Sequence, residues 1–350
     1  MAKTALITGV TGQDGAYLAK FLLDKGYSVF GIYRRLSTPN FWRLHHLGIL
    51  ERISLIPGDL IDGGSLLDAL RIADPDEVYN LAAQSFVGAS FEQPVVTGEL
   101  SGIGATRLLE LIRITNPSIK FYQASTSELF GSGHTSASNE NSPFRPSSPY
   151  AAAKLYSFWM TKIYREGFDI FACNGILFNH ESPLRGLEFV TRKITNGVAK
   201  IALGLETELR LGNLSSKRDW GYAPDYVESM WLMLQQNESD DFVVATNHAH
   251  SVREFVEKAF NEVGLDWQDY VKVDKRFMRP LDVGFLEGDA SKIRKIGWAP
   301  KVDFDSLVKI MVSEDLSRWQ RWQNGEGFPW DAFNYPGEDK ILSRYQPKDM

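Results

Sequence analysis

The chain has 350 residues, 43% of them hydrophobic and 23% charged, which suffices for one large α/β unit or two closely packed domains. This composition excludes a collagen-like, a mucin-like or an intrinsically disordered protein. The net charge of -6, from 38 basic and 44 acidic residues, offers no overall basic field, so we expect no nucleic-acid partner. An anionic ligand must therefore be held by local groups.

Cys173 is the only cysteine of the chain, and it cannot form an intramolecular disulfide. The sequence contains neither a signal-like segment nor an apolar run of about 18 residues, the length that a membrane span needs. These features predict a cytoplasmic protein without a membrane partner. The histidines have no cysteine partners at zinc-finger spacing, so we expect no metal site.

The first 175 residues alternate short β-branched runs with longer helical patterns, which predicts right-handed βαβ units. We therefore expect an α/β protein with a Rossmann-type, doubly wound parallel sheet covered by helices on both faces. The expected strands are 4–8, 28–33, 53–56, 77–80, 120–123 and 170–175, and the expected helices are 15–25, 41–50, 64–72, 101–115 and 149–166.

The pattern changes after about residue 180, which predicts a smaller α/β substrate-binding lobe. We expect residues 1–178 to form the Rossmann domain, with segments near 205–235 returning to it, and residues 179–316 to form mainly the second lobe. The elements expected there are helices at 189–203, 224–236 and 251–263 and strands near 208–211 and 242–245.

The C-terminal tail, residues 317–350, carries seven aromatic residues between positions 319 and 345 among Gly, Pro and Asn. Left uncovered, they would form a large exposed apolar patch, so we expect the tail to be ordered. Its glycines and prolines favour an irregular strap over a regular helix, with Trp330 and Phe333 as anchors. Truncation after Leu316 is expected to cost stability or assembly more than chemistry.

The strand at 4–8 leads directly into Gly9-x-x-Gly12-x-x-Gly15, and residues 16–23 follow as an amphipathic helix. Glycines at such a junction allow a tight turn and let backbone N–H groups approach a pyrophosphate. The spacing differs from the Gly-x-Gly-x-x-Gly of many dehydrogenases, and an ordinary glycine turn is the alternative. The place after the first strand favours a dinucleotide site that includes the intervening Thr11, Gln13 and Asp14.

The second strand is followed by Arg34 and Arg35, where NAD-binding proteins carry a carboxylate for the ribose hydroxyls. Guanidinium groups suit a 2′-phosphate, so we expect NADP as the cofactor. Two solvated surface arginines are the alternative. The third and fourth strands end at the same sheet edge, where a cofactor lies in open α/β sheets, and they contribute Asp59, Leu60, Leu81, Ala82 and Ala83.

Tyr150 is the only one of 13 tyrosines with a lysine four residues later, and a helix would place Lys154 on the same face. An ammonium neighbour favours the phenolate, which makes Tyr150 a candidate base for a sugar or alcohol hydroxyl. The strand that ends near Gln123 delivers Thr126 and Glu128 to the same edge, as a hydrogen-bonding hydroxyl and a second acid or base. Turn and cap roles are the alternative for these two residues.

These motifs resemble the extended short-chain dehydrogenase/reductase superfamily and, within it, the GDP-mannose 4,6-dehydratase family. The resemblance extends over roughly residues 3–316, and the tail beyond has no recognised counterpart. Its most specific parts are the Asn-His-Glu-Ser-Pro run at 179–183 and the Arg-Asp-Trp-Gly run at 218–221. The other segments that carry it are 8–15, 122–131, 148–150 and 175–178.

The resemblance implies that GDP-mannose, or a close GDP-sugar, loses water while hydride passes from C4 to NADP and back to C6. Tyr150, Lys154 and Thr126 would act at the C4 hydroxyl, and Glu128 would act as the base at C5. Further cofactor contacts are implied for Ser85, His180 and Arg185. Substrate contacts are implied for Ser85, Asn179, Glu188, Lys193, Arg218, Arg279 and Asp282; the last of these departs from the glutamate expected there.

The family resemblance also implies a homodimer or a homotetramer. Two related activities remain open, because small differences in a pocket decide them: dehydration of a GDP-heptose, or dehydration followed by reduction of the 4-keto product. A catalytically idle NADP-sensing module would need no tyrosine base. The presence of Tyr150 with Lys154, Thr126 and Glu128 disfavours that third interpretation.

Overall fold

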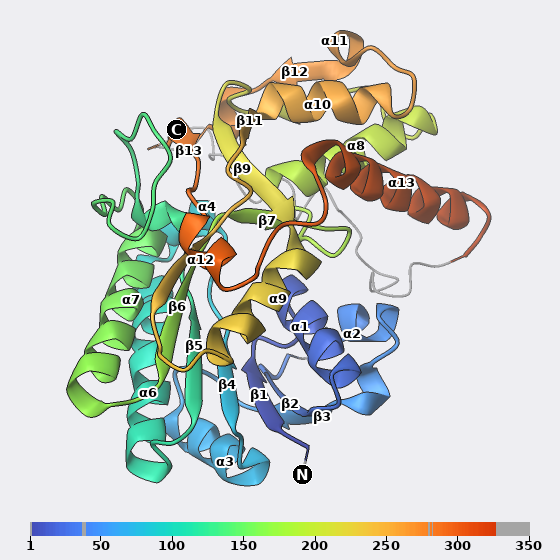
Figure 1. The fold of residues 1–350 in the computed structure, drawn as a ribbon. Helices are drawn as coiled ribbons and strands as arrows, with labels where there is room; N and C mark the ends of the chain where they lie inside the picture. Colours follow the sequence, from blue (N-terminus) through green and yellow to red (C-terminus); the bar gives the residue numbers. More distant parts are fainter. Residues whose placement is uncertain (1, 37–39, 279–280, 282, 327–350) are drawn as a thin grey trace.

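A computed structural model describes residues 2–36, 40–278, 281 and 283–326 (Figure 1). The central layer is a seven-stranded sheet of order β10-β6-β5-β4-β1-β2-β3, and its neighbouring strands run parallel. The strand order reverses between β1 and β4, which is where open α/β sheets bind their ligands. This sheet confirms the predicted fold class. The strands are β1 (Thr4–Thr8), β2 (Ser28–Tyr33), β3 (Ser54–Pro57), β4 (Glu77–Asn80), β5 (Lys120–Ala124), β6 (Ala172–Leu177) and β10 (Asp241–Val244).

Helices cover both faces of this sheet (Figure 1). One face carries α3 (Gly63–Ala73), α6 (Gly104–Thr115) and α7 (Pro149–Phe168), with a hydrophobic core between helices and strands. The other face carries α1 (Gln13–Asp24) and α9 (Ala223–Leu234) over a second core. Because helices cover both faces, inner strands such as β4 and β6 are buried along their whole length.

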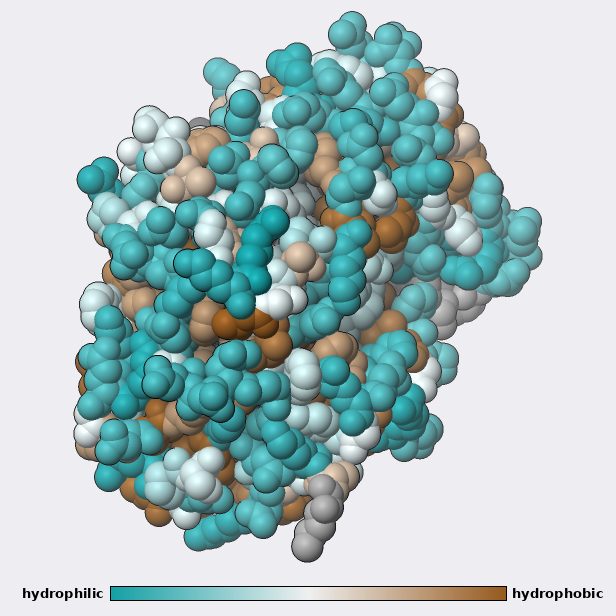
Figure 2. Space-filling view, viewed as in Figure 1, coloured by the Kyte–Doolittle hydropathy of each residue, from teal (hydrophilic) through white to brown (hydrophobic). Residues whose placement is uncertain are grey.

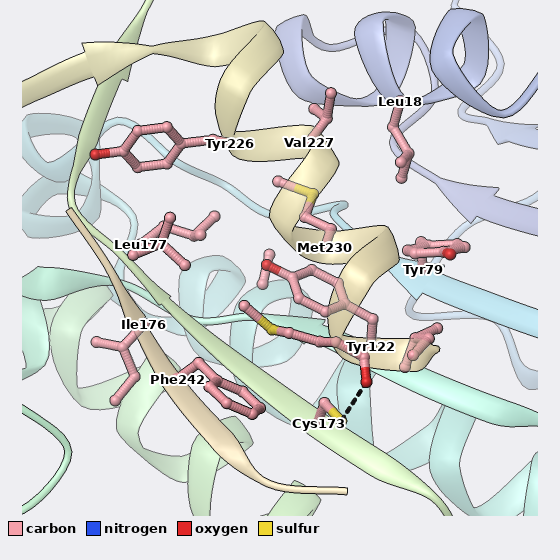
Figure 3. Packing of buried hydrophobic residues seen from close by; sticks show 14 of the residues in the cluster. Leu18, Tyr79, Tyr122, Cys173, Ile176, Leu177, Tyr226, Val227, Met230 and Phe242 are labelled. Atoms are coloured by element: carbon pink, nitrogen blue, oxygen red, sulfur yellow. Dashed lines mark hydrogen bonds between the residues drawn. The ribbon is translucent and has the colours of Figure 1, made fainter. Parts of the chain in front are cut away.

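Figure 3 shows the core between the sheet and α9, where Met230 lies beside the ring of Tyr122. Cys173 belongs to this core, and its Sγ donates a long hydrogen bond of 3.8 Å to Met233 O. Burial raises the pKa of the Cys173 thiol to about 12. The cysteine is therefore a packing residue without thiolate reactivity.

The second lobe has its own core, formed by helices α8 (Val190–Ala202), α10 (Val252–Asn261) and α13 (Phe304–Gln323) against short strands. Trp220 packs against Phe255 and Phe304 in its centre. The strands of this lobe are β7 (Asn179–Glu181), β9 (Lys217–Tyr222), β11 (Ala249–Ser251) and β13 (Phe285–Leu286) in one sheet, and β8 (Leu209–Leu211) with β12 (Val271–Val273) in another.

Several short elements complete the described chain, and most were missed by the sequence prediction. The segment before α6 is helical as well, whereas the sequence analysis placed no element between the strand at 77–80 and the helix at 101–115. The expected helix at 41–50 is shorter and is followed by a 3-10 turn. These elements are α2 (Trp42–His46), 3-10 turns at Leu50–Arg52, Ser127–Leu129 and Lys275–Phe277, α4 (Val87–Glu92), α5 (Pro94–Gly98), the π turn (Glu99–Ile103), α11 (Trp267–Tyr270) and α12 (Ser291–Lys295).

The prediction of an irregular segment from residue 317 is wrong as far as Gln323, because α13 continues to that residue. Trp319 docks on α8, where its Nε1 donates to Asn196 Oδ1 at 2.8 Å and Lys200 Nζ lies 4.6 Å from its ring centroid. Tertiary packing of an aromatic side chain therefore extends the helix. The expected anchors Trp330 and Phe333 lie outside the described residues.

The surface in Figure 2 is mostly hydrophilic, and the hydrophobic patches on that face are small and separate. No helix in the described part of the chain is long and apolar enough to cross a membrane.

Candidate active site

The loop between β1 and α1 requires glycine for steric reasons. Gly9 has φ of +70°, and a Cβ there would lie 2.9 Å from the Ala82 backbone, while a Cβ on Gly15 would lie 2.3 Å from Gly9 O. Gly12 donates its N–H to Gly9 O at 3.0 Å and caps α1 without a side chain. The first amides of α1 therefore have no side-chain cap, a cradle that fits the pyrophosphate of a dinucleotide.

A buried polar chain joins the carboxyl ends of the three central strands. Thr8 Oγ1 donates to Asn80 Oδ1 at 2.7 Å, and Asn80 Nδ2 donates to Gln123 Oε1 at 2.7 Å. Thr8 Oγ1 also accepts the amides of Leu81 and Ala82 at 3.1 Å. The chain ties the loop after β4 to the glycine loop, and the prediction missed it because its members lie far apart in sequence.

The four predicted catalytic residues lie together beyond β5. Tyr150 is hydrogen-bonded with Thr126, whose Oγ1 also accepts the Glu128 amide at 3.2 Å. Lys154 Nζ donates to Ala124 O at 2.8 Å, on the last residue of β5. Ser148 caps α7 by accepting the Ala151 amide, so the helix begins just before Tyr150 and points Tyr150 and Lys154 to one face.

Burial dominates the electrostatics of this cluster. It raises the pKa of Tyr150 to about 12, a rise that the Thr126 hydrogen bond opposes and the Glu128 carboxylate reinforces. It lowers the pKa of Lys154 to about 8. A further positive charge beside Tyr150 would lower the pKa of Tyr150 and so favour its phenolate. Because the pKa of Lys154 is about 8, this lysine keeps its proton below about pH 8.

Asp14 and His180 form an ion pair between the glycine loop and β7. His180 Nε2 lies 2.8 Å from Asp14 Oδ2, and Nδ1 lies 2.7 Å from Phe178 O. Both partners accept hydrogen bonds, so both ring nitrogens carry protons. Burial lowers the pKa of His180, but Asp14 outweighs it and the net shift is upward; burial likewise raises the pKa of Asp14, but the imidazolium brings it down to about 2.

Apart from Ser85, which follows β4, the described residues that are predicted to hold the substrate lie in the second lobe. Asn179 begins β7, Arg218 lies on β9 with its Nη1 donating to Lys217 O, and Glu188 is in the loop before α8. Lys193 Nζ lies 3.2 Å from the Phe277 ring centroid, and burial lowers its pKa to about 8. Two further predicted contacts, Arg279 and Asp282, lie outside the described residues.

The predicted cofactor contacts of the Rossmann domain follow its strands. Arg34 and Arg35 are exposed directly after β2, and Ser85 is exposed in the segment that follows β4. Arg185 lies in the loop after β7, and its guanidinium lies 3.6 Å from the Phe189 ring centroid. The remaining predicted contacts, Thr11, Gln13, Asp59, Leu60, Leu81, Ala82 and Ala83, are in loops at the carboxyl ends of β1, β3 and β4 or at the start of α1.

The Arg-Asp-Trp-Gly run has a structural basis that the sequence did not indicate. Asp219 is fully buried and accepts the amides of Thr246 and Asn247 at 2.8 and 3.0 Å, and a Cβ on Gly221 would lie 2.3 Å from the Tyr226 ring. The run therefore fixes β9 in the second lobe, which leaves Arg218 as its candidate ligand contact.

Residues 6–311 match the family model described as GDP-mannose 4,6 dehydratase. The chain is 53% identical over 330 residues to GDP-mannose 4,6 dehydratase 1 of Arabidopsis thaliana, covering 91% of each protein. Two solved structures share the fold. One is a dTDP-glucose 4,6-dehydratase from Streptomyces venezuelae with NAD and TYD bound (TM-score 0.81, 23% identity, 94% of this chain and 99% of that one). The other is RMD from Pseudomonas aeruginosa complexed with NADPH (TM-score 0.74, 21% identity, 90% and 100%).

The parallel sheet, the glycine loop and the Tyr150–Lys154 pair define an extended short-chain dehydrogenase/reductase. Within that class, the chain belongs to the GDP-mannose 4,6-dehydratase family. Both findings confirm the family predicted from the motifs.

Proposed function

We propose that this chain is an NADP-dependent hydro-lyase that converts GDP-D-mannose into GDP-4-dehydro-6-deoxy-D-mannose and water. The observation that carries the proposal is the grouping of Thr126, Glu128, Tyr150 and Lys154 beyond β5, beside a glycine loop that fits a dinucleotide. This grouping supplies two proton-transfer groups of different chemistry at one sheet edge. A 4,6-dehydration needs both, because protons leave from the C4 hydroxyl and from C5.

Tyr150 is the proposed base at the C4 hydroxyl. It takes the hydroxyl proton while Thr126 shares a hydrogen bond with the reacting oxygen, and the Lys154 ammonium favours the phenolate. When bound, NADP accepts the C4 hydride at its nicotinamide and later returns a hydride to C6. The new C4 ketone makes the C5 proton acidic.

Glu128 is the proposed acid and base for the elimination. Its carboxylate takes the C5 proton, and the resulting acid protonates the hydroxyl that leaves C6 as water. Hydride then adds at C6, and the Tyr150 phenol returns the proton that it took from the C4 hydroxyl to C5, which restores a saturated sugar and the starting state of the tyrosine. The sugar loses one water, and the cofactor ends the cycle in its starting oxidation state.

The GDP-sugar would be held between the two lobes by the groups around β7, β9 and α8. Lys193 and Arg218 are proposed to bind the diphosphate of the GDP-sugar. Asn179 and Glu188 are proposed to form hydrogen bonds with its other polar groups. Arg279 and Asp282 stay predictions. The proposed cofactor contacts are those of the glycine loop together with Arg34, Arg35, Ser85, His180 and Arg185. A cytoplasmic location also stays a prediction.

The decisive experiment uses GDP-mannose deuterated at C4. Purified protein with NADP⁺ is expected to form a 4-keto product that carries the deuterium at C6, because hydride returns within the same active site. Absence of dehydration would contradict the proposed function. Dehydration of a GDP-heptose instead, or onward reduction of the keto product, would favour one of the two related activities.

Cofactor choice is tested by replacing Arg34 and Arg35 together with glutamine. The double variant is expected to bind NADP⁺ roughly tenfold or more weakly, with little change for NAD⁺, because only NADP⁺ carries the 2′-phosphate. Calorimetric titration of each cofactor measures both values. Arg71→Gln, an exposed arginine on α3, is the matched control. Equal losses for the two cofactors would show that the arginine pair serves another purpose.

We propose that two copies of the chain pair through the outer face of α7. Tyr156, Trp159 and Ile163 lie on one stripe of that helix and are each nearly half exposed, beside the exposed Val95 of α5. Trp159→Glu is expected to lower the mass measured by light scattering to that of a smaller assembly. Ile72→Glu, on the exposed surface of α3, is the control. A monomeric wild-type chain, or an unchanged mass for Trp159→Glu, would contradict this interface.

A further inference from the structure

Three successive backbone carbonyls in the loop between β7 and α8 accept hydrogen bonds from arginine side chains. Arg192 Nη1 donates to Pro183 O at 2.7 Å and to Arg185 O at 2.9 Å, and Arg43 Nε donates to Leu184 O at 2.8 Å between them. Such charge-assisted bonds are stronger than bonds between neutral groups. The loop that carries Arg185 is therefore held from two sides, by α2 and by α8.

Arg43 also connects this loop to the glycine loop. Its Nη1 donates to Thr11 O at 3.1 Å. A second connection runs through Ser182, whose Oγ donates to Gln13 Oε1 at 2.7 Å. These contacts fix the separation between the glycine loop and the loop after β7.

Arg192 is oriented by Asp315 of α13. Asp315 accepts from Arg192 Nε at 2.9 and 3.0 Å, and its Oδ1 lies 2.8 Å from Arg192 Nη2. Thr195 and Arg318 also donate to this carboxylate, at 2.6 and 2.8 Å. Arg192 is 4% exposed and Asp315 is 0% exposed, so water does not substitute for either partner. Nε and Nη2 of Arg192 face the Asp315 carboxylate, while Nη1 donates to the carbonyls of Pro183 and Arg185. A lysine cannot reproduce this arrangement, because its side chain has a single nitrogen.

Arg185 is the charged side chain carried by the loop between β7 and α8 that these hydrogen bonds fix. Its Nε lies 3.0 Å from Glu181 Oε2, which limits where the guanidinium can turn. At both Tyr150 and Asp14, burial acts to raise the pKa, and the positive charge of Arg185 acts against burial to lower it. Arg185 therefore acts on the catalytic tyrosine and on the glycine loop together.

We propose that Arg192 and Asp315 are positioning residues for the dinucleotide, because they hold the loop in the conformation that directs Arg185 toward the cofactor. The inference rests on the proposed function in the cofactor role given to Arg185. It makes α13, which follows every catalytic motif in the chain, part of the support of the cofactor site. Arg318, which lies beyond Leu316, donates to Asp315, so truncation after Leu316 would also remove one contact of this support.

The test compares Arg192→Lys with Arg165→Lys. Arg165 is a matched control, because it forms a two-bond pair with Asp241 at 2.8 and 2.9 Å and donates to Ala172 O, but at the amino-terminal edge of the sheet. Both variants are expected to melt at a lower temperature. Only Arg192→Lys is expected to raise the Kd for NADP⁺, by roughly tenfold in calorimetric titration, the scale of one charge-assisted hydrogen bond. Its kcat at saturating NADP⁺ should change far less than its KM for NADP⁺.

Arg43→Lys provides a second variant if Arg192→Lys does not fold, since Arg43 holds the same loop from the partly exposed α2. It too is expected to raise the Kd for NADP⁺ roughly tenfold. A folded Arg192→Lys protein with the wild-type Kd overturns the proposal, and so does an equal loss of affinity in Arg165→Lys. A wild-type protein that binds NADP⁺ but does not dehydrate GDP-mannose refutes the proposed function alone, because the Kd comparison is made without the sugar.

Discussion

Glu128→Gln is expected to lose turnover by a factor of about 10² or more, the usual scale for removing a positioned base. The amide keeps the shape of the carboxylate and its place beside Thr126, so the binding of cofactor and GDP-sugar should persist. Because Tyr150 is intact, the variant should still oxidise C4. Mixing it with GDP-mannose is therefore expected to give an absorbance rise from reduced nicotinamide that does not decay.

Solvent deuterium sharpens this test. The wild-type protein is expected to incorporate deuterium at C5 during turnover, because the original C5 proton leaves with the water and the proton that replaces it comes from a hydroxyl that exchanges with solvent. The variant is expected to leave C5 unlabelled, because it does not remove the C5 proton. Glu140→Gln serves as the control, because Glu140 is a half-buried glutamate whose carboxylate accepts the Val243 amide away from the cluster. Near-normal dehydration by Glu128→Gln would remove Glu128 from the mechanism.

Tyr150→Phe is expected to block the first step, the oxidation at C4 that Glu128→Gln leaves intact, with a loss of about 10² to 10⁴ in turnover. The ring stays in its buried place and only the hydroxyl is lost, so the fold and NADP⁺ binding should be retained. Without a base at the C4 hydroxyl, no reduced nicotinamide should form on mixing with GDP-mannose. Because Glu128→Gln should still form reduced nicotinamide and Tyr150→Phe should not, one stopped-flow experiment distinguishes the roles of the two residues.

Tyr122→Phe is the matched control for this variant. Tyr122 is a buried tyrosine on β5, and its hydroxyl has no hydrogen-bond partner within the described chain. Its removal should leave turnover unchanged. If Tyr150→Phe still produced reduced nicotinamide at the wild-type rate, another group would have to take the C4 proton.

Local sequence was sufficient for the Rossmann half of the protein. Short β-branched or aromatic runs alternate with longer helical patterns, so their order predicts the parallel sheet without knowledge of packing. The turn of the glycine loop is equally local, because its glycines lie together at the end of β1, whereas the close approach of Gly9 to Ala82 beyond β4 is a tertiary contact. The spacing of Tyr150 and Lys154 is likewise set by one helix.

The second lobe was predicted less well, for two physical reasons. Strands of two or three residues, such as β7 and β13, are too short to show a period. The end of α13 depends on Trp319 docking against Asn196, a contact across 123 positions that local propensity does not contain.

The amino-acid sequence by itself determined the parallel sheet, the glycine loop, the place of Tyr150 and Lys154 on one helix, and the family, because each depends on neighbouring residues or on a short spacing along one element. Only the tertiary structure decided how the site is supported. The imidazolium of His180 beside Asp14, and the pairing of Arg192 with Asp315, join residues 166 and 123 positions apart. Their free energies depend on burial and on the removal of water. For Asp14 and His180 these arise when the two lobes pack together, and for Arg192 and Asp315 they arise when α8 packs against α13 within the second lobe.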